Sequence, residues 1–150
     1  MTETVIVTPE GRRANQGRFI PPLLLIPFVL YNILALTLMG WNPAGWTTQL
    51  FTIPMVSNVE WSLTWSDVML VVGLICLFFE VIKSTNTGRN SVLEHMASTA
   101  LFVAFLIEFL LFAPAASSTF FLLMVMALVD VVAGFTISIT GAGRDVTMGN

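Results

Sequence analysis

Four long apolar stretches, separated by shorter polar segments, dominate the pattern of the sequence. They cover residues 19–39, 66–83, 91–112 and 118–140. A helix that crosses a hydrocarbon core of about 30 Å needs about 20 apolar residues, so each stretch is long enough for one crossing. The pattern predicts an all-α membrane protein with four transmembrane helices in one domain, residues 19–140, between polar tails at 1–18 and 141–150.

The first stretch contains three prolines and two polar residues. Pro21 and Pro22 suit the start of a helix, where a missing N–H costs nothing. Pro27 lies further in and is expected to kink or loosen the first turns. The polar positions are Tyr31 and Asn32, and an amide in lipid needs a partner. We therefore expect Asn32 to face another helix.

The segment at residues 40–65 forms the longest connection, and it has no Lys or Arg. All tryptophans of the chain lie in it: Trp41, Trp46, Trp61 and Trp65. Because tryptophan prefers the headgroup level, this loop is predicted to lie along the outer membrane interface. Apolar residues occupy every second position from Val59 to Trp65, a period that predicts a short β-hairpin with residues 50–56 on the bilayer surface. Pro54 restricts its strand to a sheet edge.

Capping residues indicate where the later helices begin. Thr64-x-x-Asp67 and Ser91-x-x-Glu94 have the spacing of capping boxes, in which the two side chains bond to the first free backbone N–H groups. Pro114 ends the third helix, and Ser117 or the serine after it caps the fourth.

The basic residues all fall on one side of this topology. They are Arg12, Arg13, Arg18, Lys83, Arg89 and Arg144. Because cytoplasmic segments carry the excess of Lys and Arg, both termini are predicted to be cytoplasmic. No cleaved secretory or twin-arginine signal is recognisable. We therefore expect a multi-pass protein of a bacterial-type inner (plasma) membrane, with an organellar membrane as the alternative.

Composition supports the membrane assignment and narrows the chemistry. Charged residues make up 10% of the chain, against about 25% in soluble domains. The net charge of −3 argues against a nucleic-acid partner. One cysteine, Cys76, and one histidine, His95, allow no intrachain disulfide and no Cys/His metal cage. No nucleophile elbow, phosphate loop, CxxC or HExxH motif is present, so neither an enzyme nor a cofactor is expected.

Two acids lie deep in the predicted spans. Counted at 1.5 Å per residue, Glu108 lies toward the outer leaflet and Asp130 near the bilayer centre. A charge at the centre of a lone spanning helix costs roughly 2.5–3.5 kcal/mol on insertion scales, so such a group must be shielded, paired or protonated. No basic residue shares the counted depth of Asp130, so its candidate partners are Asn32, Tyr31 and Ser or Thr hydroxyls.

A third acid is predicted near the inner end of the second span. There Glu80 should form a modest ion pair with Lys83, close to water. Small residues gather on the same helix face, which is therefore the predicted packing face. That face comprises Ser66, Met69, Gly73, Cys76 and Glu80.

Three hypotheses for function follow. The first is a non-catalytic subunit or oligomer-forming scaffold of a membrane complex, whose partners are lipids and either copies of itself or other membrane subunits. Asn32, Glu80, Glu108 and Asp130 would then be polar groups at helix contacts. The second is a proton or cation pathway through Asp130 and Glu108. The third is lipid or quinone binding between helices near the Trp-rich loop.

Overall fold

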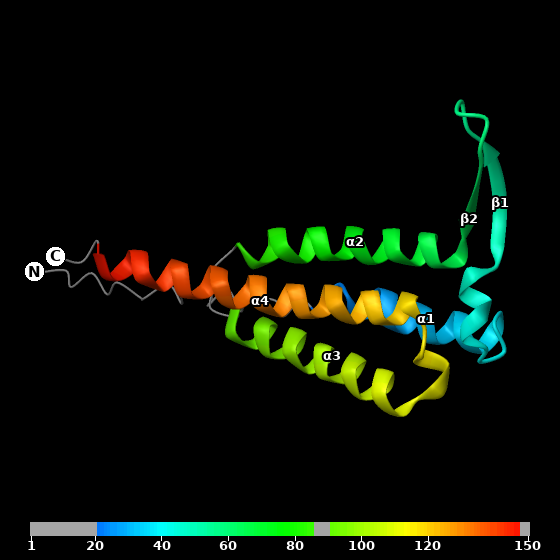
Figure 1. Ribbon diagram of the computed structural model, residues 1–150. Helices are drawn as coiled ribbons and strands as arrows, with labels where there is room; N and C mark the ends of the chain where they lie inside the picture. Colours follow the sequence, from blue (N-terminus) through cyan, green and yellow to red (C-terminus); the bar gives the residue numbers. More distant parts are fainter. Residues whose placement is uncertain (1–20, 86–90, 148–150) are drawn as a thin grey trace, which may run out of the picture.

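The computed structural model describes residues 21–85 and 91–147, except for the side chains of residues 91 and 141–147. This part of the chain is mostly helical, with four α-helices and one two-stranded sheet (Figure 1). The elements are α1 (Leu25–Thr37), the 3-10 helix η1 (Pro43–Thr47), β1 (Gln49–Pro54), β2 (Glu60–Thr64), α2 (Trp65–Ser84), α3 (Ser91–Leu111), the 3-10 helix η2 (Ala113–Ala115) and α4 (Ser118–Thr147). Three helices, α2, α3 and α4, are long and apolar enough to cross a membrane, as predicted.

Several predictions concern residues that lie outside the described part. They are the N-terminal tail with Arg12, Arg13 and Arg18, the loop residue Arg89, the side chain of Arg144, and the last residues of the C-terminal tail. The predicted tail from residue 141 differs in its first part, because α4 continues as a helix to Thr147.

The first helix is shorter than predicted. α1 has 13 residues instead of the expected span at 19–39, and it is too short to count among the membrane-crossing helices. Its prolines explain the difference. Pro27 occupies the first turn of α1, where backbone N–H groups have no helical partner, so it marks the start of the helix and does not kink it. In the same turn, Ile26 N–H donates to the Leu23 carbonyl, which lies before the helix, at 3.0 Å.

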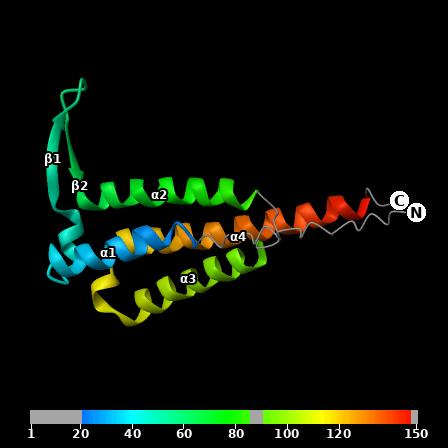
Figure 2. The same ribbon diagram turned by 180° about the vertical axis from the view of Figure 1, so that it is seen from behind.

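Helix α4 lies in the middle of the bundle, between α2 and α3 (Figures 1 and 2). We call the end of the bundle that carries η1, β1, β2 and η2 the hairpin end, and the opposite end, where α2 ends and α3 begins, the α2–α3 end. The buried residues of α2 are Met69, Gly73, Cys76 and Glu80, which confirms the predicted packing face. A Cβ on Gly73 would come within 2.6 Å of Leu123 Cδ2, so the missing side chain lets α2 approach α4 closely.

An aromatic cluster fills the core at the hairpin end and attaches α1 to the longer helices. Phe120 of α4 is fully buried at its centre, with the Tyr31 ring at 4.7 Å and the Phe105 ring at 5.3 Å between centroids. Trp46 stacks on Tyr31 at 4.3 Å and is buried. It lies in the core because η1 folds back against α2. That the tryptophans of this loop lie at the depth of the outer membrane interface stays a prediction.

The predicted hairpin is present. β1 and β2 pair antiparallel, and Met55 N–H closes the turn to the Val59 carbonyl at 2.9 Å. Asn58 takes a left-handed backbone with φ 61°, which Asn tolerates better than most residues. Pro54 is the last residue of β1, and in a two-stranded sheet its strand is an edge, as the sequence requires.

Capping predictions hold where the structure describes the cap. Thr64 Oγ1 accepts from Asp67 N–H at 3.3 Å, and Thr64 N–H donates to the Asp67 carboxylate at 2.8 Å. Ser117 Oγ accepts from Phe120 N–H at 3.1 Å at the start of α4. α3 begins at Ser91 itself, so the residue that caps it falls outside the described part.

Candidate functional site

Polar side chains from α2, α3 and α4 come together inside the bundle toward the α2–α3 end. They surround a cavity of about 10 Å³, which is about the space that one water molecule needs. The lining residues are Glu80, Lys83, Ser84, Glu94, His95, Ser98 and Asp130, and we call them the polar cluster. Glu80 and Asp130 are each only 4% exposed, so both carboxyl groups depend on protein partners.

Glu80 connects three parts of the chain. One carboxylate oxygen accepts from Lys83 Nζ at 2.8 Å, and the other accepts from Leu23 N–H, just before α1, at 2.6 Å. Lys83 Nζ also lies 3.8 Å from a Glu94 carboxylate oxygen on α3. The ion pair with Lys83 is therefore present as predicted, but Glu80 lies in the core and not close to water. Nothing in the sequence singled out Leu23 as a partner of Glu80, because it contributes its backbone N–H and not its side chain.

Asp130 has one neighbour of the kind that was predicted. The Ser98 hydroxyl lies beside it, and Lys83 and His95 line the same cavity. The other two expected partners, Tyr31 and Asn32, lie near the hairpin end. Tyr31 donates to the Pro114 carbonyl at 3.1 Å and pairs with Ser117, and Asn32 Nδ2 donates to the Phe28 carbonyl at 3.1 Å.

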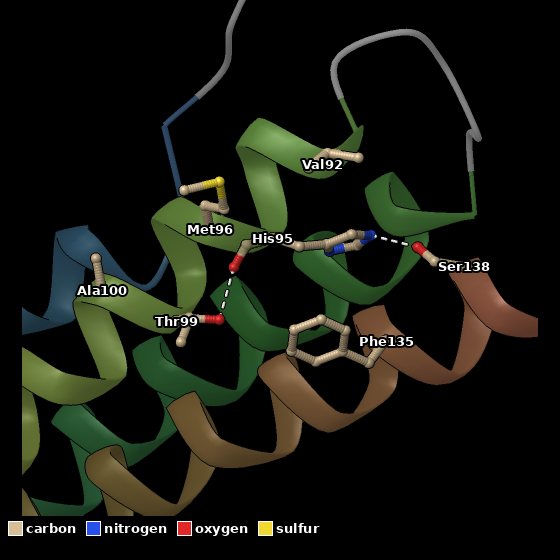
Figure 3. Close-up of a pocket in the computed structure, with 7 residues that line it drawn as sticks. All are labelled: Val92, His95, Met96, Thr99, Ala100, Phe135 and Ser138. Atoms are coloured by element: carbon tan, nitrogen blue, oxygen red, sulfur yellow. Dashed lines mark hydrogen bonds between the residues drawn. The ribbon is translucent and has the colours of Figure 1, made fainter.

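His95 bridges α3 and α4. Its Nε2 lies 2.6 Å from the Ser138 hydroxyl, and Figure 3 shows the ring reaching from α3 across to α4. Beside it is a groove of about 500 Å³, lined by Val92, His95, Met96, Thr99, Ala100, Phe135 and Ser138. The connection between His95 and Asp130 was not predicted, because nothing in the linear pattern shows which helix the His95 ring will meet.

The contact between His95 and Gly134 gives a prediction. A Cβ on Gly134 would lie 2.6 Å from His95 Nδ1, so Gly134→Ala should displace the ring and break its bond with Ser138. His95 is the only histidine, so ¹⁵N-histidine NMR of the purified protein reports on it alone. The Nε2 resonance of Gly134→Ala should match that of Ser138→Ala. Gly73→Ala, which touches Leu123 instead, should keep the wild-type resonance, and an unshifted Gly134→Ala spectrum would contradict this packing.

A second polar feature lies between α1 and α3, toward the hairpin end. Glu108 and Asn32 line an open groove of about 380 Å³. The other lining residues are Phe28, Val29, Ile33, Leu36 and Trp41. The Asn32 side chain is the polar group beside the Glu108 carboxyl group. One oxygen of this carboxyl group, Oε1, is buried and has no partner among the described residues.

The apolar core separates the two polar features. Ser98 and Glu108 lie on the same helix, roughly 15 Å apart along its axis at 1.5 Å per residue. The buried residues Leu101 and Phe105 lie between them on α3, packed with Leu123 of α4. Asp130 and Glu108 therefore belong to separate sites.

Among residues 21–85 and 92–140, no three His, Cys, Asp or Glu side chains are arranged to hold a metal ion. Comparison of the chain with protein-family models, with curated proteins and with solved structures finds no match.

Proposed function

We propose that this chain is a small integral membrane protein that crosses a bacterial-type inner membrane four times, with both termini inside, and acts as a non-catalytic subunit of a membrane complex. The three long apolar helices support the membrane placement. α1 would cross together with the residues before it. That short non-helical stretch fits a membrane because Pro22 and Leu24 are buried in protein and Leu23 N–H is bonded to Glu80.

The observation that carries the subunit role is the unpartnered oxygen of Glu108. An acid within a spanning segment is costly unless a group bonds to it, and the described chain supplies only Asn32. The groove around Glu108 is open and, apart from Glu108 and Asn32, mainly apolar. A transmembrane helix that places a hydroxyl, amide or basic side chain in this groove would bond to Oε1 once the carboxyl group turns toward it, and would cover the apolar walls. The partner is thus another copy of this chain or a different membrane subunit.

The proton or cation pathway is the second candidate. The polar cluster supports it, because Asp130, His95 and Lys83 share one cavity. The buried Leu101 and Phe105 argue against it in a single chain, because they leave no hydrogen-bonded route from Asp130 to Glu108. Proton flux into liposomes at background level for both the natural chain and Asp130→Asn would end this alternative.

Lipid or quinone binding is the third candidate. The expected place was beside the Trp-rich loop and the first helix. The groove at His95 lies toward the other end of the bundle, and it offers one histidine among mainly apolar walls. A ligand seen between Trp61 or Trp65 and α1 would favour this third role.

Native mass spectrometry from mild detergent tests the subunit proposal. The natural chain should appear in particles heavier than its own 16.5 kDa, and the mass identifies a homo-oligomer or a foreign subunit. Glu108→Leu should release the 16.5 kDa monomer while its helical circular dichroism stays unchanged, because the variant removes an unsatisfied acid and not a packed group. Glu108→Gln, which keeps hydrogen-bonding capacity, should retain part of the complex. A natural chain that is monomeric, or association unchanged in Glu108→Leu, would refute the proposal.

A further inference from the structure

The strand register sorts the side chains of the hairpin onto two unlike faces. Successive residues of a strand point to opposite faces, and directly paired residues share a face. The pairs Phe51–Leu63 and Ile53–Trp61 make one face, and the pairs Thr52–Ser62 and Pro54–Glu60 make the other. One face is therefore entirely apolar. The other is largely polar, and it carries Glu60, the only charged residue between positions 49 and 64.

The described residues leave the apolar face largely uncovered. Phe51 is 53% exposed, Trp61 47% and Ile53 39%. On the polar face the hydroxyl groups of Thr52 and Ser62 lie 3.3 Å apart. A two-stranded hairpin is only marginally stable alone in water. A hairpin with this much exposed aromatic surface therefore needs a surface beyond the described residues to cover it.

The direction of the hairpin identifies that covering surface. In both views it projects across the helix axes, away from the bundle on the side of α2 (Figures 1 and 2). β2 ends at Thr64 and α2 begins at Trp65, so no linker separates them. A hairpin that projects across the end of a spanning helix lies along the surface of the membrane, and one of its faces looks back along the helix toward the lipid beside α2. Val68 and Val71, in the first two turns of α2, are exposed as well.

We propose that the hairpin is a lipid-binding arm, with its Phe51–Ile53–Trp61–Leu63 face on the outer leaflet and its Thr52–Glu60–Ser62 face in water. The inference rests on the proposed membrane placement but not on the subunit role. Tryptophan at the headgroup level and aliphatic side chains just below it are the chemistry that a bilayer interface accepts. No Lys or Arg lies between positions 49 and 64, so the attraction of the hairpin to the bilayer is apolar and needs no anionic lipid.

Site-directed spin labelling of the full chain in phosphatidylcholine liposomes tests the arm. Cys76 is the only cysteine, so Cys76→Ser gives a clean background. Labels at Phe51→Cys and Ile53→Cys should collide more with membrane-soluble oxygen than with a water-soluble nickel chelate. Labels at the matched positions Thr52→Cys and Ser62→Cys should show the opposite preference. Alternation between neighbouring residues cannot arise from unfolding, which would make all positions alike.

Two other outcomes would overturn the arm. Nickel access at all four positions would place the hairpin in water. Low access to both reagents at Phe51→Cys and Ile53→Cys, with nickel access at the other two, would show that a protein surface covers the apolar face. Failure of the subunit proposal would leave the alternation intact, because a monomer in a liposome keeps the same hairpin and the same lipid.

Discussion

Glu80→Ala should lower the free energy of unfolding of the bundle by about 3 kcal/mol, at the lower end of the range for breaking a buried ion pair. The substitution leaves Leu23 N–H and Lys83 Nζ without their carboxylate, and both groups lie against the core. Because Glu80 links the start of α1 to α2 and, through Lys83, to α3, the loss affects three helices together. Reversible unfolding in mixed detergent, followed by circular dichroism, measures the difference.

Two variants make the Glu80 result specific. Glu80→Gln can still accept from Leu23 N–H, so it should recover part of the lost stability. Glu60→Ala removes an exposed acid of the hairpin and should change the stability by less than about 0.5 kcal/mol. Equal stability of Glu80→Ala and the natural chain would mean that the ion pair is solvated, as the sequence alone suggested.

Local sequence signals predicted the parts of the fold that depend on local physics. The packing face of α2, the Thr64–Asp67 capping box and the hairpin each follow from periodicity or from one favoured interaction between near neighbours. The predicted length of the first helix was wrong because a proline such as Pro27 can either kink a helix or lie in its first turn. Only the surrounding packing decides between these two positions.

The membership of the polar cluster was missed for a different reason. Asp130, Ser98 and Glu80 all lie roughly three to four helical turns from the hairpin end of their helices. Counting every helix from that common end would have placed them at one level. The predicted spans, which are unequal in length, instead put Glu80 near the inner end and Asp130 near the bilayer centre, and nothing in the sequence singled out Ser98. Which of these side chains turn toward one another depends on how the helices pack around α4. That packing cannot be worked out from the sequence pattern of each helix taken separately.

The same limit applies to Glu108 and to the tryptophans. An apolar helix predicts that an acid within it needs a partner, but not that the nearest helix will offer only one amide. Likewise a Trp-rich loop predicts a place at the membrane interface, but not that Trp46 will also be buried in the protein by stacking on Tyr31. Short loop segments such as η1 are positioned by these tertiary contacts, so their residues are the hardest to assign in advance.

Phe120→Ala should destabilise the bundle by about 3–5 kcal/mol, the range for removing a fully buried phenylalanine. Phe120 is the centre of the aromatic cluster, with the Tyr31 ring of α1 at 4.7 Å and the Phe105 ring of α3 at 5.3 Å. α1 is short, so this cluster and the Leu23–Glu80 bond supply much of what attaches it. Amide hydrogen exchange should therefore rise most in α1, while the amides in the half of α2 nearer the α2–α3 end keep their protection.

Phe78→Ala is the matched control, since it removes the same side chain from a position that is 61% exposed and faces away from the core. It should cost less than about 1 kcal/mol. If Phe120→Ala and Phe78→Ala lost equal stability, the cluster would not be what holds α1. If Phe120→Ala instead raised exchange evenly through α2, α3 and α4, the bundle would unfold as one unit, and α1 would have no separate attachment to lose.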